Sequence, residues 1–182
     1  MPKPKLSDFK RLINEMTEAE LREELLKLFN KLEQVQMFYA QDLMGKEDRK
    51  KILEECKTKI YKKFWTPSGN PRNNVSNADI RKIISDFEKI SAFPNEVVEL
   101  LLYRVETATE FANSFGGMSD GDYNASTTAY DKAMKLIGKN KLHSYTKEQA
   151  LKPLKYRNLD YWYLDNLREL FNNCFEGSEG IY

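Results

Sequence analysis

Two glutamates four residues apart are the clearest candidates for chemistry in this sequence. Glu106 and Glu110 lie in segment 94–115, where apolar residues recur with the period of a helix. The spacing places both carboxylates on one helix face, where they could bind a divalent cation or form an acid–base pair. Tyr103 and Asn113 share this face and extend it into a candidate binding stripe. A metal-dependent or hydrolytic enzyme built around Glu106 and Glu110 is therefore one hypothesis.

The simpler interpretation of this stripe is a solvated helix face. Helical bundles that hold two metal ions add a histidine three residues after a glutamate. No Glu-x-x-His occurs in this chain, which has a single histidine. Glutamate is also almost always exposed unless it is paired. We therefore expect no bound metal and no cofactor, and the sequence identifies no catalytic residue.

Basic residues gather in two segments. Residues 46–72 hold nine basic and four acidic side chains, and residues 132–157 hold eight basic and one acidic. Lysines beside aromatic residues can grip a single strand through phosphate attraction and base stacking. A nucleic-acid-binding protein is therefore a second hypothesis, although a solvated helix face again explains the lysines more simply. Its candidate contacts are Lys59, Lys62, Lys63, Arg72, Lys152, Lys155 and Arg157.

An aromatic run near the C-terminus offers a third candidate surface. Tyr161, Trp162 and Tyr163 are consecutive, and consecutive side chains cannot all face one way on a helix. One or two of them should therefore be partly exposed, where aromatic rings anchor protein partners well. Tyr161, Trp162 and the nearby Asp165 are the candidate contacts.

The elements that position these residues are predicted to be helices. Eight glycines and six prolines cluster between periodic segments, which is typical of an all-α protein. Thr17 and Glu20 form a capping box that opens a helix running to residue 44. In that helix Leu28, Leu32 and Val35 belong to a seam with alternating spacings of four and three, typical of helices packed side by side, so we expect them to be buried.

The predicted fold has six or seven helices in a single domain, residues 1–182. A glycine-centred turn at residue 45 should fold helices 17–44 and 46–65 into a long antiparallel hairpin. A compact helical bundle or a short α–α superhelix should follow. The expected organisation is a hairpin arm over 1–65, a loop or hinge over 66–76, a bundle over 77–176 and a tail over 177–182. Within the bundle we expect helices at 77–90, 94–115, 120–137, 146–151 and 159–175.

Composition excludes several classes of protein. Apolar residues make up 41% and charged residues 31% of the chain, which fits neither a membrane protein nor a disordered one. The start of the sequence lacks the apolar core of a signal peptide. Two cysteines 118 positions apart form no disulfide framework, so a cytoplasmic location is the simplest expectation. A net charge of +1 provides no general attraction for nucleic acid or acidic lipid.

Several strings resemble an uncharacterised family of bacterial helical proteins, a domain of unknown function. They are ISDFEKIS (84–91), LLLYRVETATEFANSFG (100–116) and YDKAMKLIG (130–138). The likeness begins at LSDFKRLINEMTEAELREELLKLF (6–29) and is clearest over 80–138. The resemblance implies a small helical protein with no assigned activity, so no catalytic residues are carried over.

One departure from that family lies in the aromatic run. Its relatives have a Trp-Gly-aromatic-His-Asp string where this chain has Tyr161-Trp-Tyr-Leu-Asp165. Leu164 stands in the place of the histidine, so an acid–base role for that histidine has no counterpart here.

Taken together, the residues favour a non-enzymatic protein-interaction or scaffold module. Its partner would be another protein or a second copy of the chain, with no membrane involved. The nucleic-acid and enzyme hypotheses remain open as alternatives.

Overall fold

The computed structural model describes residues 5–43 and 45–176, apart from the side chains of residues 41 and 42, so the predicted tail 177–182 lies outside the described residues. These residues form an all-α fold, as predicted, with no named strand among them. They contain nine α-helices instead of six or seven. The elements are α1 (Leu6–Glu15), α2 (Glu18–Lys31), α3 (Glu33–Leu43), α4 (Lys46–Phe64), α5 (Asn77–Ile90), α6 (Pro94–Phe115), α7 (Asp120–Asn140), α8 (His143–Leu151), the 3-10 turn η1 (Lys152–Lys155) and α9 (Tyr161–Phe175).

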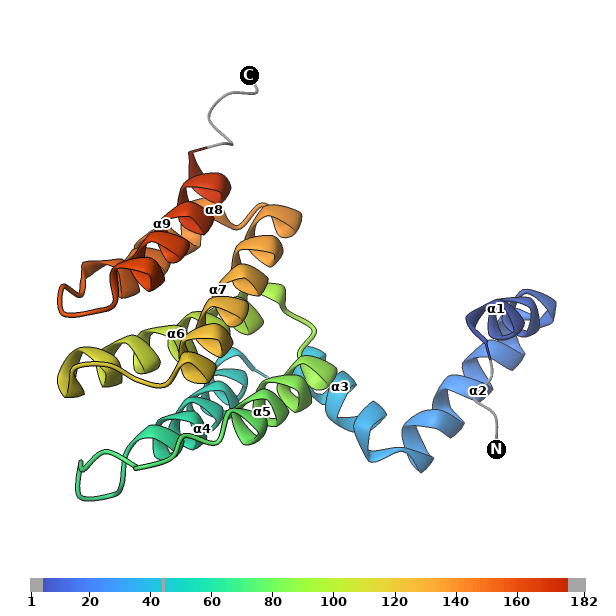
Figure 1. Cartoon of the computed structure of the whole chain (residues 1–182). Helices are drawn as coiled ribbons and strands as arrows, with labels where there is room; N and C mark the ends of the chain where they lie inside the picture. The colour runs from blue at the N-terminus through green and yellow to red at the C-terminus, as the bar shows by residue number, and fades with distance from the viewer. Residues whose placement is uncertain (1–4, 44, 177–182) are drawn as a thin grey trace.

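Helices α4 to α9 form the body of the molecule. Figure 1 shows them as pairs that follow one another in chain order, α4 with α5, α6 with α7, and α8 with α9. Helix α6 is central, because it packs against α7, α4, α5, α8 and η1. It buries more side chains than any other described helix, as its wide apolar surface predicts.

Local signals set the ends of the central helices. The Ser76 hydroxyl accepts a hydrogen bond from the Asp79 amide and begins α5. Pro94 occupies the first turn of α6, where its missing N–H costs nothing. That helix ends at Gly116, whose φ of 75° is the left-handed conformation that glycine adopts without strain. Both helices therefore have the predicted bounds, 77–90 and 94–115.

The predicted continuous helix over 17–44 is wrong. It breaks at Leu32, whose backbone is extended at φ −119° and ψ 110°. No proline or glycine marks this position in the sequence. After the break α3 packs against α5, and this tertiary contact gives the physical reason for the change of direction.

The predicted antiparallel hairpin of residues 17–44 and 46–65 is also wrong. Helix α4 packs against α6 and α5, while α3 packs against α5 and α2. Leu53, Ile60 and Phe64 of α4 are buried and belong to the core that α6 dominates. The broad apolar surface of α6 offers α4 more area to bury than the single stripe of α3 does.

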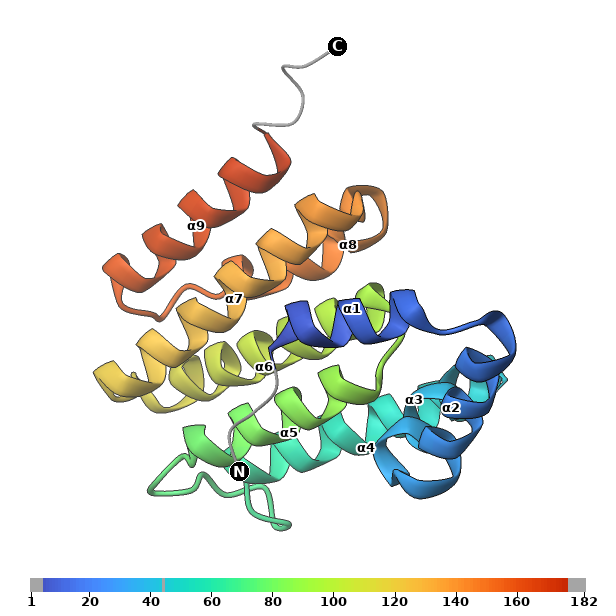
Figure 2. The ribbon, with the colours of Figure 1, turned by 90° about the vertical axis from the view of Figure 1, so that its right-hand side faces the viewer.

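The N-terminal helices project from the body as an arm, which we define as α1, α2 and α3. Figure 1 shows α3 beside the body, with α2 and α1 extending away from it, and Figure 2 shows α1 in front of the body from the side of the arm. Every residue of α1 and α2 is described, and none of them is buried. The predicted burial of Leu28, Leu32 and Val35 is therefore wrong: Leu32 is exposed and the other two are half-buried.

No helix in the described part of the chain is both long enough and apolar enough to cross a membrane.

Candidate functional site

Large apolar side chains are exposed along the arm. Fifteen such side chains are exposed in the described structure, and ten of them lie between residues 6 and 43. Their exposed fractions run from 37% to 82%, whereas core residues of the body lie below 9%. The ten are Leu6, Phe9, Leu12, Leu25, Leu26, Leu32, Met37, Phe38, Tyr39 and Leu43. We call them the apolar arm surface.

The amphipathic sequence of the arm produces this surface. Phe9, Leu12, Ile13 and Met16 recur at helical spacing in and just after α1. The capping box starts α2 as predicted, since the Thr17 hydroxyl accepts from the Glu20 amide and the Glu20 carboxylate accepts from the Thr17 amide. An amphipathic helix normally buries its apolar stripe against a neighbour. In α1 and α2 no residue is buried, so the apolar stripe is left at least partly exposed.

The apolar arm surface is large enough for a specific interface. A standard interface buries about 800 Å² on each partner. Ten side chains of this size, roughly half exposed, supply an area of that order. Exposed apolar area on this scale makes the arm a candidate interaction surface.

The predicted stripe of Glu106 and Glu110 continues toward the N-terminus of α6 through Glu99 and Glu96, and its glutamates are largely paired with cations from neighbouring elements. Lys57 Nζ of α4 lies 2.6 Å from Glu99 Oε1, and Lys152 Nζ of η1 lies 3.4 Å from Glu106 Oε1. Arg49 Nε of α4 lies 3.1 Å from Glu96 Oε1. These ion pairs join α4 and η1 to the central helix. The stripe therefore has a structural role between elements.

Acidic side chains do not converge around Glu106 and Glu110. Asp86 of α5 pairs with Lys89, and Asp165 of α9 pairs with Arg168. Among the described residues, no three His, Cys, Asp or Glu side chains are placed to hold a metal ion. The described residues therefore contain no cluster of acids around Glu106 and Glu110 that would support the enzyme hypothesis.

Tyr103 and Asn113 lie at two ends of the same face of α6. The Lys57 ammonium is 5.7 Å from the centre of the Tyr103 ring, and burial raises the pKa of that tyrosine. Asn113 Oδ1 accepts a 3.2 Å hydrogen bond from the Asn158 amide. Both side chains support neighbouring elements, one α4 and the other the loop before α9.

The aromatic run lies in the first turn of α9 and is split between surface and core. Tyr161 and Trp162 are exposed, whereas Tyr163 is fully buried, so the predicted partial exposure is confirmed. The Trp162 ring lies edge-on to Tyr123, 5.4 Å away. Leu164 is buried in the core of this chain.

The basic candidates fall into two groups. Lys59, Lys62, Lys63 and Arg72 line one shallow cleft of about 400 Å³ at the C-terminal end of α4. Arg72 Nε donates a 2.7 Å hydrogen bond to the Lys62 carbonyl there. Cations at a helix C-terminus also stabilise its dipole.

The second basic group belongs to a different element. Lys152 and Lys155 lie in η1, and Arg157 follows it; all three are exposed. Lys152 turns toward Glu106 of α6, whereas Lys63 of the first group turns toward Asp79 of α5. The two groups therefore face different neighbours.

Comparison with protein families gives one match. The profile of a family of unknown function (DUF6155) matches residues 4–175, which is nearly the whole chain. The chain belongs to this family. No curated protein and no solved structure matches it. Membership in DUF6155 confirms the resemblance to a domain of unknown function over most of the chain and adds no activity to it.

The DUF6155 match spans both the arm and the body, so the matched residues of this chain include the apolar arm surface. Sequence reasoning found the apolar seam of residues 17–44 but assigned it a partner within the chain. It did not single out Arg104, although this is the sole basic residue of segment 94–115. A single basic residue in a helix with a wide apolar surface could have indicated that Arg104 is buried.

Proposed function

We propose that this member of DUF6155 is a non-enzymatic interaction module that pairs with a second copy of itself through the arm. The observation that supports the proposal is the apolar arm surface, with its ten exposed large side chains. In addition, no residue of α1 or α2 is buried. Covering such a surface is favoured by about 25 cal/mol for each Å² of apolar area removed from water.

The arm of a second copy is the best match for this surface. An apolar stripe needs an apolar partner, and only five exposed large apolar or aromatic residues are found in the described body. They are distributed over α4, α6, α8 and α9 as Tyr61, Phe115, Tyr145, Tyr161 and Trp162. A two-fold axis instead brings identical patches together and covers both at once. Two copies of α1 and α2 then supply the four helices of a bundle.

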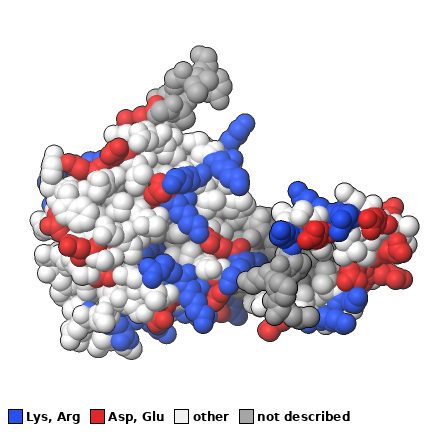
Figure 3. Space-filling model, turned by 45° about the vertical axis from the view of Figure 1, so that its right-hand side comes forward, with Lys and Arg blue, Asp and Glu red and all other residues white. Residues whose placement is uncertain are grey.

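The charges of the arm are compatible with such pairing. Residues 5–43 contain six basic and eight acidic side chains, so two arms repel each other only weakly. Figure 3 shows both signs interleaved on the projecting arm. Some are already paired within a helix, as in Arg22 with Glu18 at 2.7 Å. Charged residues of both signs beside an apolar surface are typical of the polar rim of known interfaces.

The test compares the solution mass of three full-length proteins by light scattering. Wild type should have twice its chain mass of 21.4 kDa. The double variant Leu12→Glu and Leu25→Glu should be monomeric, because it places two charges within the paired surface. Both positions are exposed in the single chain, so the variant should keep its helical content and melting cooperativity.

Tyr145→Glu is the matched control. Tyr145 is the most exposed aromatic residue of the described body and lies on α8, away from the arm. Its variant should keep the mass of wild type. A monomeric wild type, or a dimer that survives the double substitution, would contradict the proposal.

A second candidate function is single-strand binding at the cleft lined by Lys59, Lys62, Lys63 and Arg72. It is favoured by the convergence of these four cations, with the exposed Tyr61 stacked on Trp65 nearby. Fluorescence anisotropy with a labelled oligothymidine at low salt tests it. Binding that weakens in Lys62→Gln would support this function, and no binding at low salt would exclude it.

A further inference from the structure

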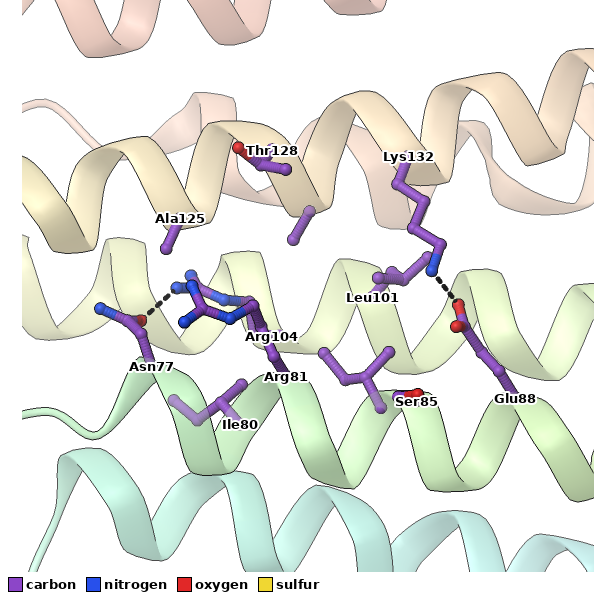
Figure 4. A pocket seen from close by; sticks show the side chains of 12 residues that line it. Asn77, Ile80, Arg81, Ser85, Glu88, Leu101, Arg104, Ala125, Thr128 and Lys132 are labelled. Carbon is purple, nitrogen blue, oxygen red and sulfur yellow. Dashed lines mark hydrogen bonds and ion pairs between the residues drawn. The ribbon is translucent and has the colours of Figure 1, made fainter. Parts of the chain in front are cut away.

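A cavity of about 300 Å³ lies between α5, α6 and α7 of the body, and no residue of the arm lines it. Figure 4 shows side chains from all three helices pointing into it. One end holds Asn77, Arg81 and Arg104, and the other holds Glu88 and Lys132. Its volume is at the lower end of the range for ligand pockets.

Arg104 is the unusual component of this cavity. It extends from the central helix, is only 2% exposed, and donates a 3.0 Å hydrogen bond from Nη2 to Asn77 Oδ1. Its Nη1 atom is buried and has no hydrogen-bond partner in the described structure. Buried donors are nearly always satisfied, so an unpaired guanidinium nitrogen on a residue that lines a cavity calls for a partner.

The charge of Arg104 is only partly compensated. Among the described residues no carboxylate is within ion-pairing distance of it. Asp122 reaches Arg104 only through Asn77, whose Nδ2 donates a 2.5 Å hydrogen bond to Asp122 Oδ1. Burial lowers the pKa of Arg104 to about 10, against the opposing effects of Tyr163 and Asp122. The group therefore stays cationic at neutral pH and carries a desolvation cost.

Arg81 adds a second positive charge to the same end. It lies on α5, is exposed, and is close enough to Arg104 to disfavour the charge of that group. Figure 4 shows the two guanidinium groups at the end of the cavity that also holds Asn77. Two arginines that repel each other are stabilised by an anion between them, because each presents a planar set of donors to oxygen atoms.

Five of the other lining residues are apolar, and Ser85 and Thr128 add two hydroxyl groups. The apolar residues include Ile80, Ile84, Leu101 and Ala129. At the far end Lys132 Nζ lies 2.5 Å from Glu88 Oε1, so that charge is already paired. The free positive charge is thus confined to the arginine end.

We propose that this cavity binds a small organic anion. Its carboxylate or phosphate group accepts hydrogen bonds from Arg104 and Arg81, and its short apolar part lies against Ile80, Ile84 and Leu101. Arg104 is the buried anchor, and Arg81 closes over the anion from the solvent side. The site needs neither the arm nor a second copy of the chain.

The test uses calorimetric titration of the full chain with sodium phosphate, acetate and hexanoate, each against sodium chloride at equal ionic strength. Saturable binding of one anion per chain is expected. Phosphate bound more tightly than both acids would assign the head group as phosphate. Hexanoate bound at least tenfold more tightly than acetate would assign it as a carboxylate with an apolar body.

Two variants on neighbouring residues separate the site from general charge. Arg81→Gln should weaken binding at least tenfold, whereas Lys82→Gln, an equal charge change on an exposed residue outside the cavity, should stay within twofold of wild type. Arg104→Met should abolish binding. If Arg104→Met does not fold, Arg81→Gln still decides the test, because Arg81 is exposed. The double arm variant Leu12→Glu and Leu25→Glu should bind as wild type does.

Three results would overturn the proposal. They are no saturable binding of any of the three anions, equal loss of binding in Arg81→Gln and Lys82→Gln, and affinity for acetate equal to that for hexanoate without tighter phosphate binding. None of these results depends on the mass measurement that tests pairing of the arms, so the two proposals can fail separately.

Discussion

The hydroxyl oxygen of Tyr163 on α9 lies 2.8 Å from the Ser126 hydroxyl on α7. It also lies 3.1 Å from the Thr109 hydroxyl on α6, and all three residues are fully buried. Three helices of the body are therefore joined by one set of buried hydroxyl groups. Removing the central hydroxyl leaves Ser126 without this partner in the core.

We predict that Tyr163→Phe lowers the free energy of unfolding by about 1–3 kcal/mol. Urea denaturation should show a lower midpoint with an unchanged slope. Tyr161→Phe, on the exposed neighbour, should change the free energy by less than about 0.5 kcal/mol. Equal effects of the two substitutions would show that the buried hydroxyl group has no special role.

Buried tyrosines should make the protein less stable at alkaline pH. Burial raises the pKa of Tyr130 and Tyr163 above the ordinary value. In the unfolded chain a tyrosine ionises near pH 10. The folded state then binds more protons than the unfolded state, so the free energy of unfolding falls as pH rises above about 10.

The Tyr130→Phe variant tests this pH dependence. It loses the 2.8 Å hydrogen bond from Tyr130 to the Ala150 carbonyl, so it should be less stable than wild type at neutral pH. It also loses one ionisable group, so its stability should fall less steeply between about pH 9 and 11. Urea midpoints measured across this range would contradict the assignment if both proteins lost stability in parallel.

The helices with strong local signals could be predicted from the sequence. Ser76 and Pro94 begin α5 and α6, and Gly116 ends α6, through interactions with their own neighbours in the chain. The predicted end at residue 137, just before Gly138, is three residues too early, because α7 continues through Gly138 to Asn140 and is capped by Lys141 at φ 54°. A glycine within a helix costs only about 1 kcal/mol, which the packing of α7 on α6 and α9 offsets.

The features that depend on tertiary structure could not be predicted in this way. Leu32 has no helix-breaking neighbour, and its extended backbone accompanies the docking of α3 on α5. An apolar seam shows that a partner is needed without showing which one. Likewise, Glu106 and Glu110 share a face as predicted, but only the structure places Lys152 beside Glu106.

We predict that stability resides in the body and little of it in the arm. Leu100 of α6 is fully buried, so Leu100→Ala should lower the free energy of unfolding by about 2–5 kcal/mol. Leu32→Ala should change it by less than about 1 kcal/mol, because Leu32 is exposed. Both substitutions should be measured in the double arm variant, which removes any contribution from pairing. A large loss of unfolding free energy in Leu32→Ala would instead show that Leu32 is buried, as the sequence predicted.

Glu106→Gln should change the free energy of unfolding only slightly. The Lys152–Glu106 pair is partly exposed at 3.4 Å, and such pairs contribute about 0–1 kcal/mol. Micromolar Mn²⁺ or Zn²⁺ should leave the melting temperature of wild type unchanged, since a ligand stabilises only the fold that binds it. A melting temperature raised by either metal in wild type, and unchanged in Glu106→Gln, would favour the enzyme hypothesis.

Amide hydrogen exchange at two protein concentrations tests the pairing of arms most directly. If a second copy covers α1 and α2, the amides of residues 6–31 should exchange markedly more slowly at the higher concentration, because pairing adds its free energy to their protection. Amides of α6, already in the core of one copy, should exchange at the same rate at both concentrations. Equal exchange of residues 6–31 at concentrations that span about a thousandfold, which would shift a pairing equilibrium by about 4 kcal/mol, would contradict the account.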